Sequence, residues 1–324
     1  EIMPNAIRIH EQGGPEVMHW ESVDLPELGS EEIRIRHTAI GLNFIDTYQR
    51  SGLYPLNPPC GLGKEAAGVV EDVGSAVKEF KKGDRVIYVG GTSAYSEVSQ
   101  IASKLVVPIP DDVEDEVAAA SMLKGMTAEY LLRRIGRVQA DDVILFHAAA
   151  GGTGLIACQW AKALGCTVIG TVSSPAKESL ARDNGCDFVI NYEQENFLDQ
   201  VMEITNGKGV RLVYDSVGRD TFDGTIGCLS TRGLFVSFGQ SSGLVPPVDL
   251  RVFNPKSLFY TRPTLFSYVA TRAELLDSSQ ALFGAIGSGK VKISINQRYP
   301  LREVAQAHAD LEGRRTTGST VLIP

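Results

Sequence analysis

Hydrophobic and polar residues alternate in short segments over about the first 120 residues. Glu32–His37 and Ala67–Val73 are two such segments, and glycine and proline separate them from their neighbours. Lys82–Ile87 has the composition of a turn that leads into a strand. A period of two is typical of β-strands with one buried face. The pattern therefore predicts a compact, partly open β-barrel for this part of the chain.

The pattern changes in the middle of the chain, where strand-like and helix-like segments alternate. Val143–Ala148 is a short hydrophobic run, Leu155–Leu164 has helical spacing, and Ser174 before Pro175 is a helix start that leads to about Asn184. Further strands are predicted at Thr167–Val172, Phe188–Asn191, Leu212–Asp215 and Leu234–Phe238. This alternation favours a doubly wound parallel sheet with helices on both faces, which we place at residues 125–263.

The last 60 residues return to mixed structure. Arg272–Ile286 has the spacing of an amphipathic helix, a second helix follows Tyr299–Leu301 and runs through Leu311, and Ser319–Ile323 is a candidate strand. This tail is too short for a domain of its own. We therefore expect an α/β protein in which residues 1–124 and 264–324 form a barrel-type substrate domain around an inserted Rossmann domain.

Composition excludes some functions. The chain has 324 residues, 43% of them hydrophobic, and a formal net charge of −8. An acidic surface disfavours nucleic-acid binding. No hydrophobic run approaches the ~20 residues that span a bilayer, and residues 1–10 show no secretory signal. Five cysteines without a Cys-x-x-Cys pair favour reduced, mostly buried thiols in a cytoplasmic protein.

A glycine-rich turn lies between the first strand and the first helix of the predicted Rossmann domain. Ala148–Ala150 lead into Gly151, Gly152, Thr153 and Gly154. Glycines let the backbone turn sharply and approach a diphosphate, to which the helix N-terminus offers N–H donors. A glycine cluster alone is a weak signal, but its position here is the one that dinucleotide binding requires. His147, beside this turn, is interpreted as a neutral buried histidine rather than a catalytic base.

The end of the next strand indicates which dinucleotide is bound. Domains specific for NAD place Asp or Glu there, about 20 residues after the turn, to hold the ribose 2′-hydroxyl. This chain has Ser173 and Ser174 instead, followed by Lys177, and Tyr192 follows the third strand. Hydroxyls and a cation accept a 2′-phosphate. The sequence therefore predicts NADPH as the cofactor.

Several motifs together resemble a known family. They are His147–Gly154, Asp215–Gly218, Ser237–Gly239, Gly41–Tyr48 and Arg50–Tyr54. The first three resemble the medium-chain dehydrogenase/reductase superfamily. The last two narrow the resemblance to the bacterial NADPH:quinone oxidoreductases, which are related to zeta-crystallin. This resemblance covers nearly the whole chain and implies a GroES-like barrel joined to a Rossmann domain.

The resemblance also implies an enzyme without metal. Zinc-dependent relatives have a cysteine where this chain has Asn43 and Gly-His-Glu where it has Gly63-Lys64-Glu65, and a third cysteine is missing near Leu123–Thr127. Asparagine and lysine are poor zinc ligands. Glu65 is interpreted as a buried structural carboxylate. Without a Lewis acid, an electron-poor carbonyl such as a quinone is the expected substrate.

The resemblance assigns further residues to the site. Asn43, Tyr48 and Tyr54 are the candidate catalytic residues, and the tyrosines either stack on a flat substrate, donate a proton or hydrogen bond, or only pack. Strand ends on the cofactor side supply Ser216, Val217, Phe238, Gly239 and Ser241. The other expected cofactor contacts are Asn43, Phe44, Asp46, Tyr48, Thr127, Arg262, Leu265 and Phe266.

Three functions remain open at this point. The first is NADPH-dependent reduction of quinones by hydride or electron transfer, and the second is reduction of alkenals or enones on the same scaffold. The third is a non-catalytic, crystallin-like NADPH-binding protein. The resemblance also implies a homodimer, in which Leu234–Phe238 and Ser257–Tyr260 extend the sheet across a two-fold axis.

Overall fold

A computed structural model describes residues 3–324, so the first two residues of the stretch read for a secretory signal lie outside it. The chain divides into two compact units. Unit 1 comprises residues up to Leu123 together with Thr271–Phe283 and Ile293–Pro324, and unit 2 comprises Lys124–Ala270 and Gly284–Lys292. The assignment of residues 1–124 and 264–324 to a substrate domain stays a prediction, because it concerns function.

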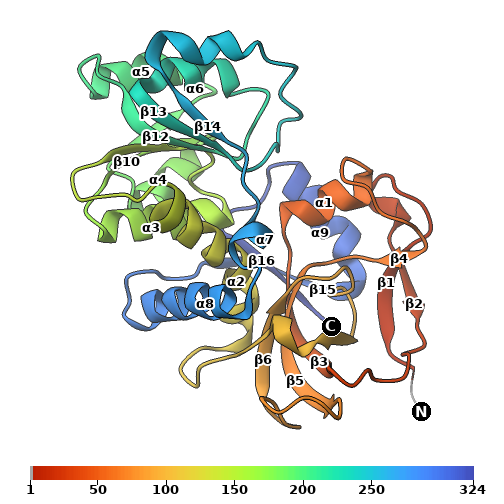
Figure 1. The fold of residues 1–324 in the computed structure, drawn as a ribbon. Coiled ribbons are helices and arrows are strands. Elements are labelled where there is room, and N and C mark those ends of the chain that lie inside the picture. Colours follow the sequence, from red (N-terminus) through yellow and green to blue (C-terminus); the bar gives the residue numbers. More distant parts are fainter. Residues whose placement is uncertain (1–2) are drawn as a thin grey trace. The chain divides into compact units, whose positions relative to one another are not determined.

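Unit 1 contains two β-sheets. The smaller sheet has the order β2-β1-β4, and the larger one has the order β15-β16-β3-β5-β6-β8 with β7 also paired to β3 (Figure 1). Their strands are β1 Asn5–Ile9, β2 His19–Ser22, β3 Glu32–Gly41, β4 Cys60–Gly61, β5 Glu65–Val73, β6 Arg85–Val89, β7 Val98–Ala102, β8 Val106–Pro108, β15 Ile295–Pro300 and β16 Ser319–Ile323. Apart from the parallel pair β15–β16, the pairing is antiparallel, as the alternating pattern predicted.

Unit 2 is built on one parallel six-stranded sheet with the order β11-β10-β9-β12-β13-β14. Figure 1 shows α3 and α4 on one side of this sheet and α5 and α6 on the other. The strands are β9 Val143–Phe146, β10 Thr167–Val172, β11 Phe188–Asn191, β12 Val210–Asp215, β13 Leu229–Ser237 and β14 Phe259–Thr261. The predicted doubly wound Rossmann-type sheet is confirmed.

The helices follow the predicted order in most of the chain. They are α1 Phe44–Ser51, α2 Asp115–Glu129, α3 Gly152–Ala163, α4 Pro175–Asp183, α5 Phe197–Ile204, α6 Phe222–Cys228, α7 Leu265–Tyr268, α8 Arg272–Gly287 and α9 Val304–Glu312. Helix α4 begins as expected, because the Ser174 side chain accepts a hydrogen bond from the Lys177 backbone N–H.

Several elements were not predicted, among them the short helix α7. Helices α1 and α2 lie in or reach into a region that was expected to be mainly β, and strand β15 was not recognised before the last helix. The predicted dimer contact also needs a correction. Strand β13 lies between β12 and β14, so Leu234–Phe238 is internal and only β14 forms that edge of the sheet.

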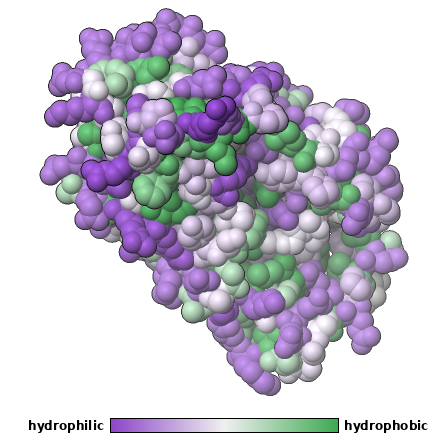
Figure 2. Space-filling model, turned by 45° about the horizontal axis from the view of Figure 1, so that its top comes forward, coloured by the Kyte–Doolittle hydropathy of each residue, from purple (hydrophilic) through white to green (hydrophobic). Residues whose placement is uncertain are grey.

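Hydrophobic cores fill both units. In unit 1, Ile33, Ile35 and Ile40 of β3 are fully buried, and in unit 2 so are Leu145 and Val213. Figure 2 shows hydrophilic residues over much of the face that it presents, with hydrophobic residues between them. All five cysteines are free thiols and four are buried, as expected. Within residues 3–324, no helix has the length and hydrophobicity needed to cross a bilayer.

Candidate functional site

In unit 1, the site is organised by the N-terminus of helix α1. Asn43 is the extended N-cap residue of this helix, and its backbone N–H donates to Asp46 Oδ2 at 3.0 Å. Gly52 ends the helix in the left-handed conformation, with φ of 92°. Asp46, one of the expected cofactor contacts, lies in the first turn of this helix, where its charge suits the helix dipole.

Glu65 fixes the side chain of Asn43. Its fully buried carboxylate accepts hydrogen bonds from Asn43 Nδ2 at 2.9 Å and from the Leu123 backbone N–H at 2.7 Å. A Cβ atom on Gly41 would lie 2.2 Å from Glu65 Oε1, so only glycine leaves room for this carboxylate. The interpretation of Glu65 as a buried structural residue is confirmed.

A buried chain of hydrogen bonds continues from Asp46 to the C-terminal part of unit 1. Tyr95 donates to Asp46 Oδ2 at 2.5 Å, and His308 Nε2 lies 3.0 Å from the Tyr95 hydroxyl. Arg50 Nη1 donates to His308 Nδ1 at 2.8 Å and to Glu312 at 2.5 Å. Burial and the nearby Arg50 lower the pKa of His308 to about 3, so this histidine is neutral in the folded protein.

Three predicted aromatic residues gather at the same helix. The Tyr48 and Tyr54 rings meet edge to face with centroids 5.4 Å apart, and Phe44 lies 6.1 Å from Tyr48. The Tyr54 backbone N–H donates to the Tyr48 carbonyl at 3.0 Å. Phe44, Tyr48 and Tyr54 are half-buried. The structure thus brings together all the predicted site residues of unit 1.

In unit 2, the glycine turn connects β9 to helix α3 as predicted. Ala148 adopts a positive φ of 56°, the Gly151 N–H donates to its carbonyl at 3.1 Å, and Gly151 is the N-cap residue of α3. In the described chain, no side chain caps this helix N-terminus. The N–H groups of Gly152 and Thr153 therefore begin a helix whose positive end suits a phosphate.

Gly154 is required for the packing of this turn. A Cβ atom there would lie 2.4 Å from the Ala148 carbonyl oxygen, whereas a Cβ on Gly151 would have only an ordinary contact at 3.4 Å. His147 is fully buried, and its two ring nitrogens lie 2.9 Å from the hydroxyls of Thr171 and Thr225. Burial lowers its pKa, and both ring nitrogens lie beside buried hydroxyls, as expected for a structural histidine.

The residues predicted to select the cofactor lie together at the end of β10. Lys177 Nζ donates to Ser173 Oγ at 3.3 Å, and Ser174 Oγ caps helix α4. The Tyr192 backbone N–H donates to the Val172 carbonyl at 3.1 Å, which places Tyr192 beside the same strand end. The end of β10 therefore has the hydroxyls of Ser173 and Ser174, the Lys177 ammonium and the Tyr192 ring nearby.

The ends of β12 and β13 are also joined. Buried Asp215 accepts hydrogen bonds from the backbone N–H groups of Val217 at 2.7 Å and Gly218 at 3.2 Å. The Phe238 N–H donates to the Asp215 carbonyl, and the Ser241 N–H donates to the Ser216 carbonyl. At Gly239, a Cβ would lie 3.0 Å from the Ser216 carbonyl oxygen, so the two strand ends approach closely.

The remaining predicted residues of unit 2 differ in their burial and in their contacts. Arg262 donates to the Ser237 carbonyl at 3.2 Å and to the Gln240 side chain at 2.7 Å, so it is fixed to the end of β13. Thr127 is buried on α2. Leu265 is buried on α7, whereas the neighbouring Phe266 is 38% exposed.

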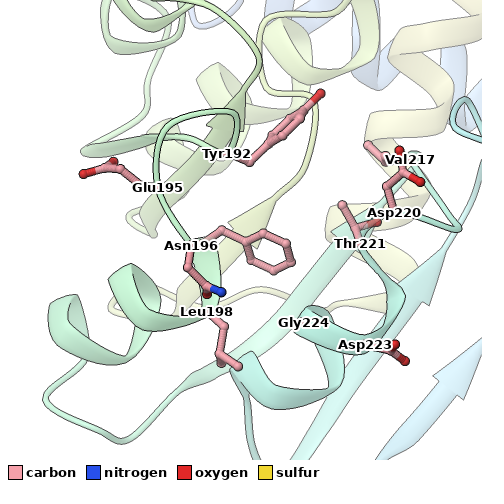
Figure 3. Close-up of a pocket in the computed structure, with 10 residues that line it drawn as sticks. Tyr192, Glu195, Asn196, Leu198, Val217, Asp220, Thr221, Asp223 and Gly224 are labelled. Carbon is pink, nitrogen blue, oxygen red and sulfur yellow. The ribbon is translucent and has the colours of Figure 1, made fainter.

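A cavity of about 460 Å³ opens beside the ends of β11 and β12 (Figure 3). Figure 3 shows Tyr192 on one side, Val217 and Thr221 on the other, and the side chain of Glu195 pointing away. Its lining residues are Tyr192, Glu195, Asn196, Phe197, Leu198, Val217, Asp220, Thr221, Asp223 and Gly224. Only Tyr192 and Val217 were predicted. Among the other lining residues, Asn196 has a signal in the sequence, because asparagine is a typical helix N-cap and Asn196 directly precedes α5.

Among the described residues, no group of three or more His, Cys, Asp or Glu side chains is arranged to hold a metal ion. The positions compared above with the cysteine and the Gly-His-Glu segment of zinc-dependent relatives hold Asn43, Lys64 and Glu65 in this chain. The absence of zinc from the working protein stays a prediction.

Two protein families match the chain. The alcohol dehydrogenase GroES-like domain matches residues 29–138, and the zinc-binding dehydrogenase family matches residues 152–282. The first match lies mostly in unit 1 and the second mostly in unit 2, in agreement with the predicted fold class of a GroES-like part and a Rossmann part.

Individual relatives match over the full length. A quinone oxidoreductase of Pseudomonas aeruginosa is 52% identical over 99% of this chain and 100% of its own, and a 2-haloacrylate reductase of Burkholderia is 44% identical over 99% of both chains. The crystal structure of Escherichia coli quinone oxidoreductase complexed with NADPH superposes with a TM-score of 0.97 at 50% identity, covering 99% of this chain and 100% of that one. The chain therefore belongs to the quinone oxidoreductase family of the medium-chain dehydrogenase/reductase superfamily.

Proposed function

We propose that this protein is an enzyme that reduces quinones with NADPH and without a metal ion. The observation that carries the proposal is the uncapped glycine turn before α3, together with Ser173, Lys177 and Tyr192 at the end of the next strand. Family membership and the NADPH complex of the Escherichia coli relative support the same conclusion.

The residues of unit 2 fit such a cofactor. The α3 N-terminus supplies backbone donors for a diphosphate, and the Lys177 ammonium with the Ser173 hydroxyl suits a ribose 2′-phosphate. Tyr192 and Val217, on opposite sides of the cavity, suit a flat base. We assign cofactor binding in unit 2 to these residues and to Gly151, Gly152, Thr153, Gly154, Ser174, Ser216, Phe238, Gly239, Ser241, Arg262, Leu265, Phe266 and Thr127.

The bound cofactor supplies a hydride, and the side chains of unit 1 orient the reacting groups. Asn43 is held by Glu65 and by Asp46, so its carboxamide has a fixed orientation for a hydrogen bond to the nicotinamide end or to the substrate. The aromatic group of Phe44, Tyr48 and Tyr54 suits a flat ring, and the tyrosine hydroxyls suit a developing phenolate. We assign the substrate role to residues 1–124 and 264–324.

The direct test follows NADPH oxidation by the purified protein with 1,4-naphthoquinone. We expect saturable turnover with NADPH and a kcat/KM at least tenfold lower with NADH. Turnover that prefers NADH would contradict the cofactor assignment.

A second candidate is reduction of an activated carbon–carbon double bond. The 44% identity to a 2-haloacrylate reductase supports it. Parallel assays with naphthoquinone and an α,β-unsaturated aldehyde separate the two activities. A non-catalytic role would be indicated by NADPH binding without turnover of any such compound.

We also propose a cytoplasmic homodimer. Free, buried thiols are consistent with a reducing compartment. Strand β14 is an edge of the sheet in unit 2, and Phe259 and Tyr260 on it are 63% and 41% exposed. Exposed hydrophobic edge strands favour pairing with a second copy across a two-fold axis. Phe259→Lys should shift the protein to a monomer in analytical ultracentrifugation.

A further inference from the structure

The loop that follows strand β12 is organised by one buried carboxylate. Asp215 is the last residue of β12 and is 1% exposed. Its Oδ1 atom accepts hydrogen bonds from the backbone N–H groups of Val217 at 2.7 Å and Gly218 at 3.2 Å. Its Oδ2 atom accepts a hydrogen bond from the Thr221 hydroxyl at 2.6 Å. Both carboxylate oxygens therefore bind donors of the loop that Asp215 begins.

Burial makes this carboxylate and the loop depend on each other. A carboxylate that is removed from water is unfavourable unless other donors replace the lost water. The two N–H groups and the Thr221 hydroxyl supply such donors. In turn, the N–H groups of Val217 and Gly218 would lack this acceptor if the carboxylate were removed. The conformation of residues 215–221 is therefore coupled to the Asp215 side chain.

The backbone of Val217 is held at both of its polar groups. Asp215 binds its N–H, and its carbonyl accepts hydrogen bonds from the Ser242 backbone N–H at 2.9 Å and the Ser242 hydroxyl at 2.7 Å. The next residue, Gly218, has a positive φ of 91°, and a Cβ on it would lie 2.8 Å from the Gly243 carbonyl oxygen. Val217 thus has a fixed position in the loop.

Two residues that Asp215 binds form part of the wall of the cavity. Val217 and Thr221 line it opposite Tyr192, as Figure 3 shows. Asp215 is not one of the lining residues given above, so it acts on the cavity through these two. A wall that is fixed before the ligand arrives loses little conformational freedom on binding, which favours affinity.

We propose that Asp215 is a positioning residue for the adenosine half of the nucleotide, because it holds Val217 and Thr221 in the cavity wall. This proposal rests on the proposed NADPH binding, in which Tyr192 and Val217 flank the flat base. NADPH and NADH have the same base and differ in the ribose 2′-phosphate. Loss of Asp215 should therefore weaken both nucleotides equally, in contrast to loss of Lys177.

The first test measures binding by isothermal titration calorimetry with NADPH, NADH and adenosine 2′,5′-bisphosphate. Asp215→Ala should raise all three dissociation constants about tenfold, because the loop loses its shared acceptor. Asp215→Asn retains an acceptor oxygen for the two N–H groups and should raise them less than threefold. The control Asp183→Ala removes an exposed carboxylate at the end of α4 and should leave them unchanged.

A second pair of variants leaves the carboxylate in place. Thr221→Val keeps nearly the shape of threonine but lacks the hydroxyl that donates to Asp215, whereas Thr221→Ser keeps that hydroxyl. Thr221→Val should raise the three dissociation constants about threefold, and Thr221→Ser should raise them less. This pair decides the question if Asp215→Ala does not fold.

A purely structural role gives a different pattern. Variants that only lose stability melt at a lower temperature but bind with wild-type dissociation constants while they are folded, which circular dichroism at the assay temperature verifies. For a positioning role, folded Asp215→Ala should have a KM for NADPH about tenfold higher with naphthoquinone and a kcat within twofold of wild type, because the change lies at the adenosine half.

Two results would overturn the proposal. One is wild-type affinity for all three ligands in the folded variants Asp215→Ala and Thr221→Val. The other is a loss confined to NADPH and the bisphosphate, which would connect Asp215 with the 2′-phosphate instead of the base. Failure of the proposed function is a separate result, because the wild type itself would then bind no NADPH or oxidise none with quinones.

Discussion

Arg50 Nη1 donates a hydrogen bond to Nδ1 of His308 at 2.8 Å, although the two residues are 258 positions apart in the sequence. Arginine only donates, so Nδ1 must accept and the proton of the neutral ring resides on Nε2. The Nε2–H therefore donates to Tyr95, whose hydroxyl donates to Asp46. In this series of hydrogen bonds, each donor points along the path that ends at the Asp46 carboxylate. That carboxylate accepts the hydrogen bond from the Asn43 backbone N–H.

The polarity of this chain predicts which substitutions of His308 are tolerated. His308→Leu removes the acceptor for Arg50 and the donor to Tyr95, so it should lower the free energy of unfolding by about 2 kcal/mol in urea titrations. His308→Gln offers an oxygen acceptor and an N–H donor and should recover at least half of that loss. Equal losses in the two variants would show that the donor–acceptor order is unimportant.

Two buried histidines predict that stability falls in mild acid. Burial lowers the pKa of His37 from 6.5 to about 4 and, with Arg50, that of His308 from 6.5 to about 3. Below pH 6.5 these two histidines bind protons in the unfolded chain but stay neutral in the folded protein. Their contribution to stability is therefore fully present above pH 6.5 and is lost as the pH falls toward 4. His37 and His308 together should contribute a slope that approaches about 2.7 kcal/mol per pH unit between pH 6 and 4, and the buried His147, whose pKa burial also lowers, adds to it.

Urea titrations at successive pH values measure the slope, and His308→Gln should lower it by about 1.4 kcal/mol per pH unit. A free energy of unfolding that stays constant from pH 7 to 4.5 would contradict the assignment of two neutral buried rings.

The group at the end of β10 predicts the cofactor preference. Lys177→Ala should weaken NADPH binding about tenfold, or ~1.4 kcal/mol, because it removes the cation for the 2′-phosphate, and it should leave NADH binding unchanged. Fluorescence titration with both nucleotides provides the measurement. Lys162→Ala is the matched control, since Lys162 pairs with Asp187 in the same unit. An equal loss for NADPH and NADH would exclude a role in selecting the phosphate.

The two outer glycines of the turn provide a second matched pair. Gly154→Ala would place a Cβ 2.4 Å from the Ala148 carbonyl oxygen, so it should destabilise the protein by about 1–3 kcal/mol and weaken NADPH binding. Gly151→Ala meets its nearest atom at 3.4 Å and has an ordinary φ of −75°, so its effect on stability should be small. Thermal unfolding with and without NADPH measures both, and a reversed order would contradict the geometry of this turn.

The sequence predicted the regular parts of the fold because local patterns encode them. Strands β10, β11 and β16 have the predicted bounds, since each is a short β-rich segment between clear turn or helix signals. Helix α2 was missed because it is alanine-rich and largely buried, which leaves no polar face to give a helical period. Strand β15 was missed because its pairing with β16 defines it, and its own sequence has little β character.

The candidate site was predictable where a motif is local. The glycine turn and the Ser173–Lys177 group were identified because their residues are close in sequence. Helix α1 had an unused signal, since Asn43 and Asp46 have the spacing of a capping box and Gly52 is a typical helix end. The Arg50–His308 bond and the Lys64–Gly91 bond join distant segments, so no local pattern indicated them.

The assignment of an enzyme without metal predicts a defined elemental analysis. Protein purified without added metal should contain less than about 0.1 zinc per chain, because asparagine and lysine replace the thiolate and imidazole that zinc prefers. Turnover with naphthoquinone should be unchanged after dialysis against EDTA. One zinc per chain, with loss of turnover on chelation, would contradict this account.

The most direct test of the central claim is a stopped-flow measurement of NADPH oxidation by the purified protein with 1,4-naphthoquinone, followed at 340 nm. The account predicts rapid, saturable loss of NADPH absorbance with wild type and a loss at least tenfold slower with Lys177→Ala at subsaturating NADPH. No loss of absorbance above the uncatalysed rate, or equal rates for the two proteins at that concentration, would contradict it.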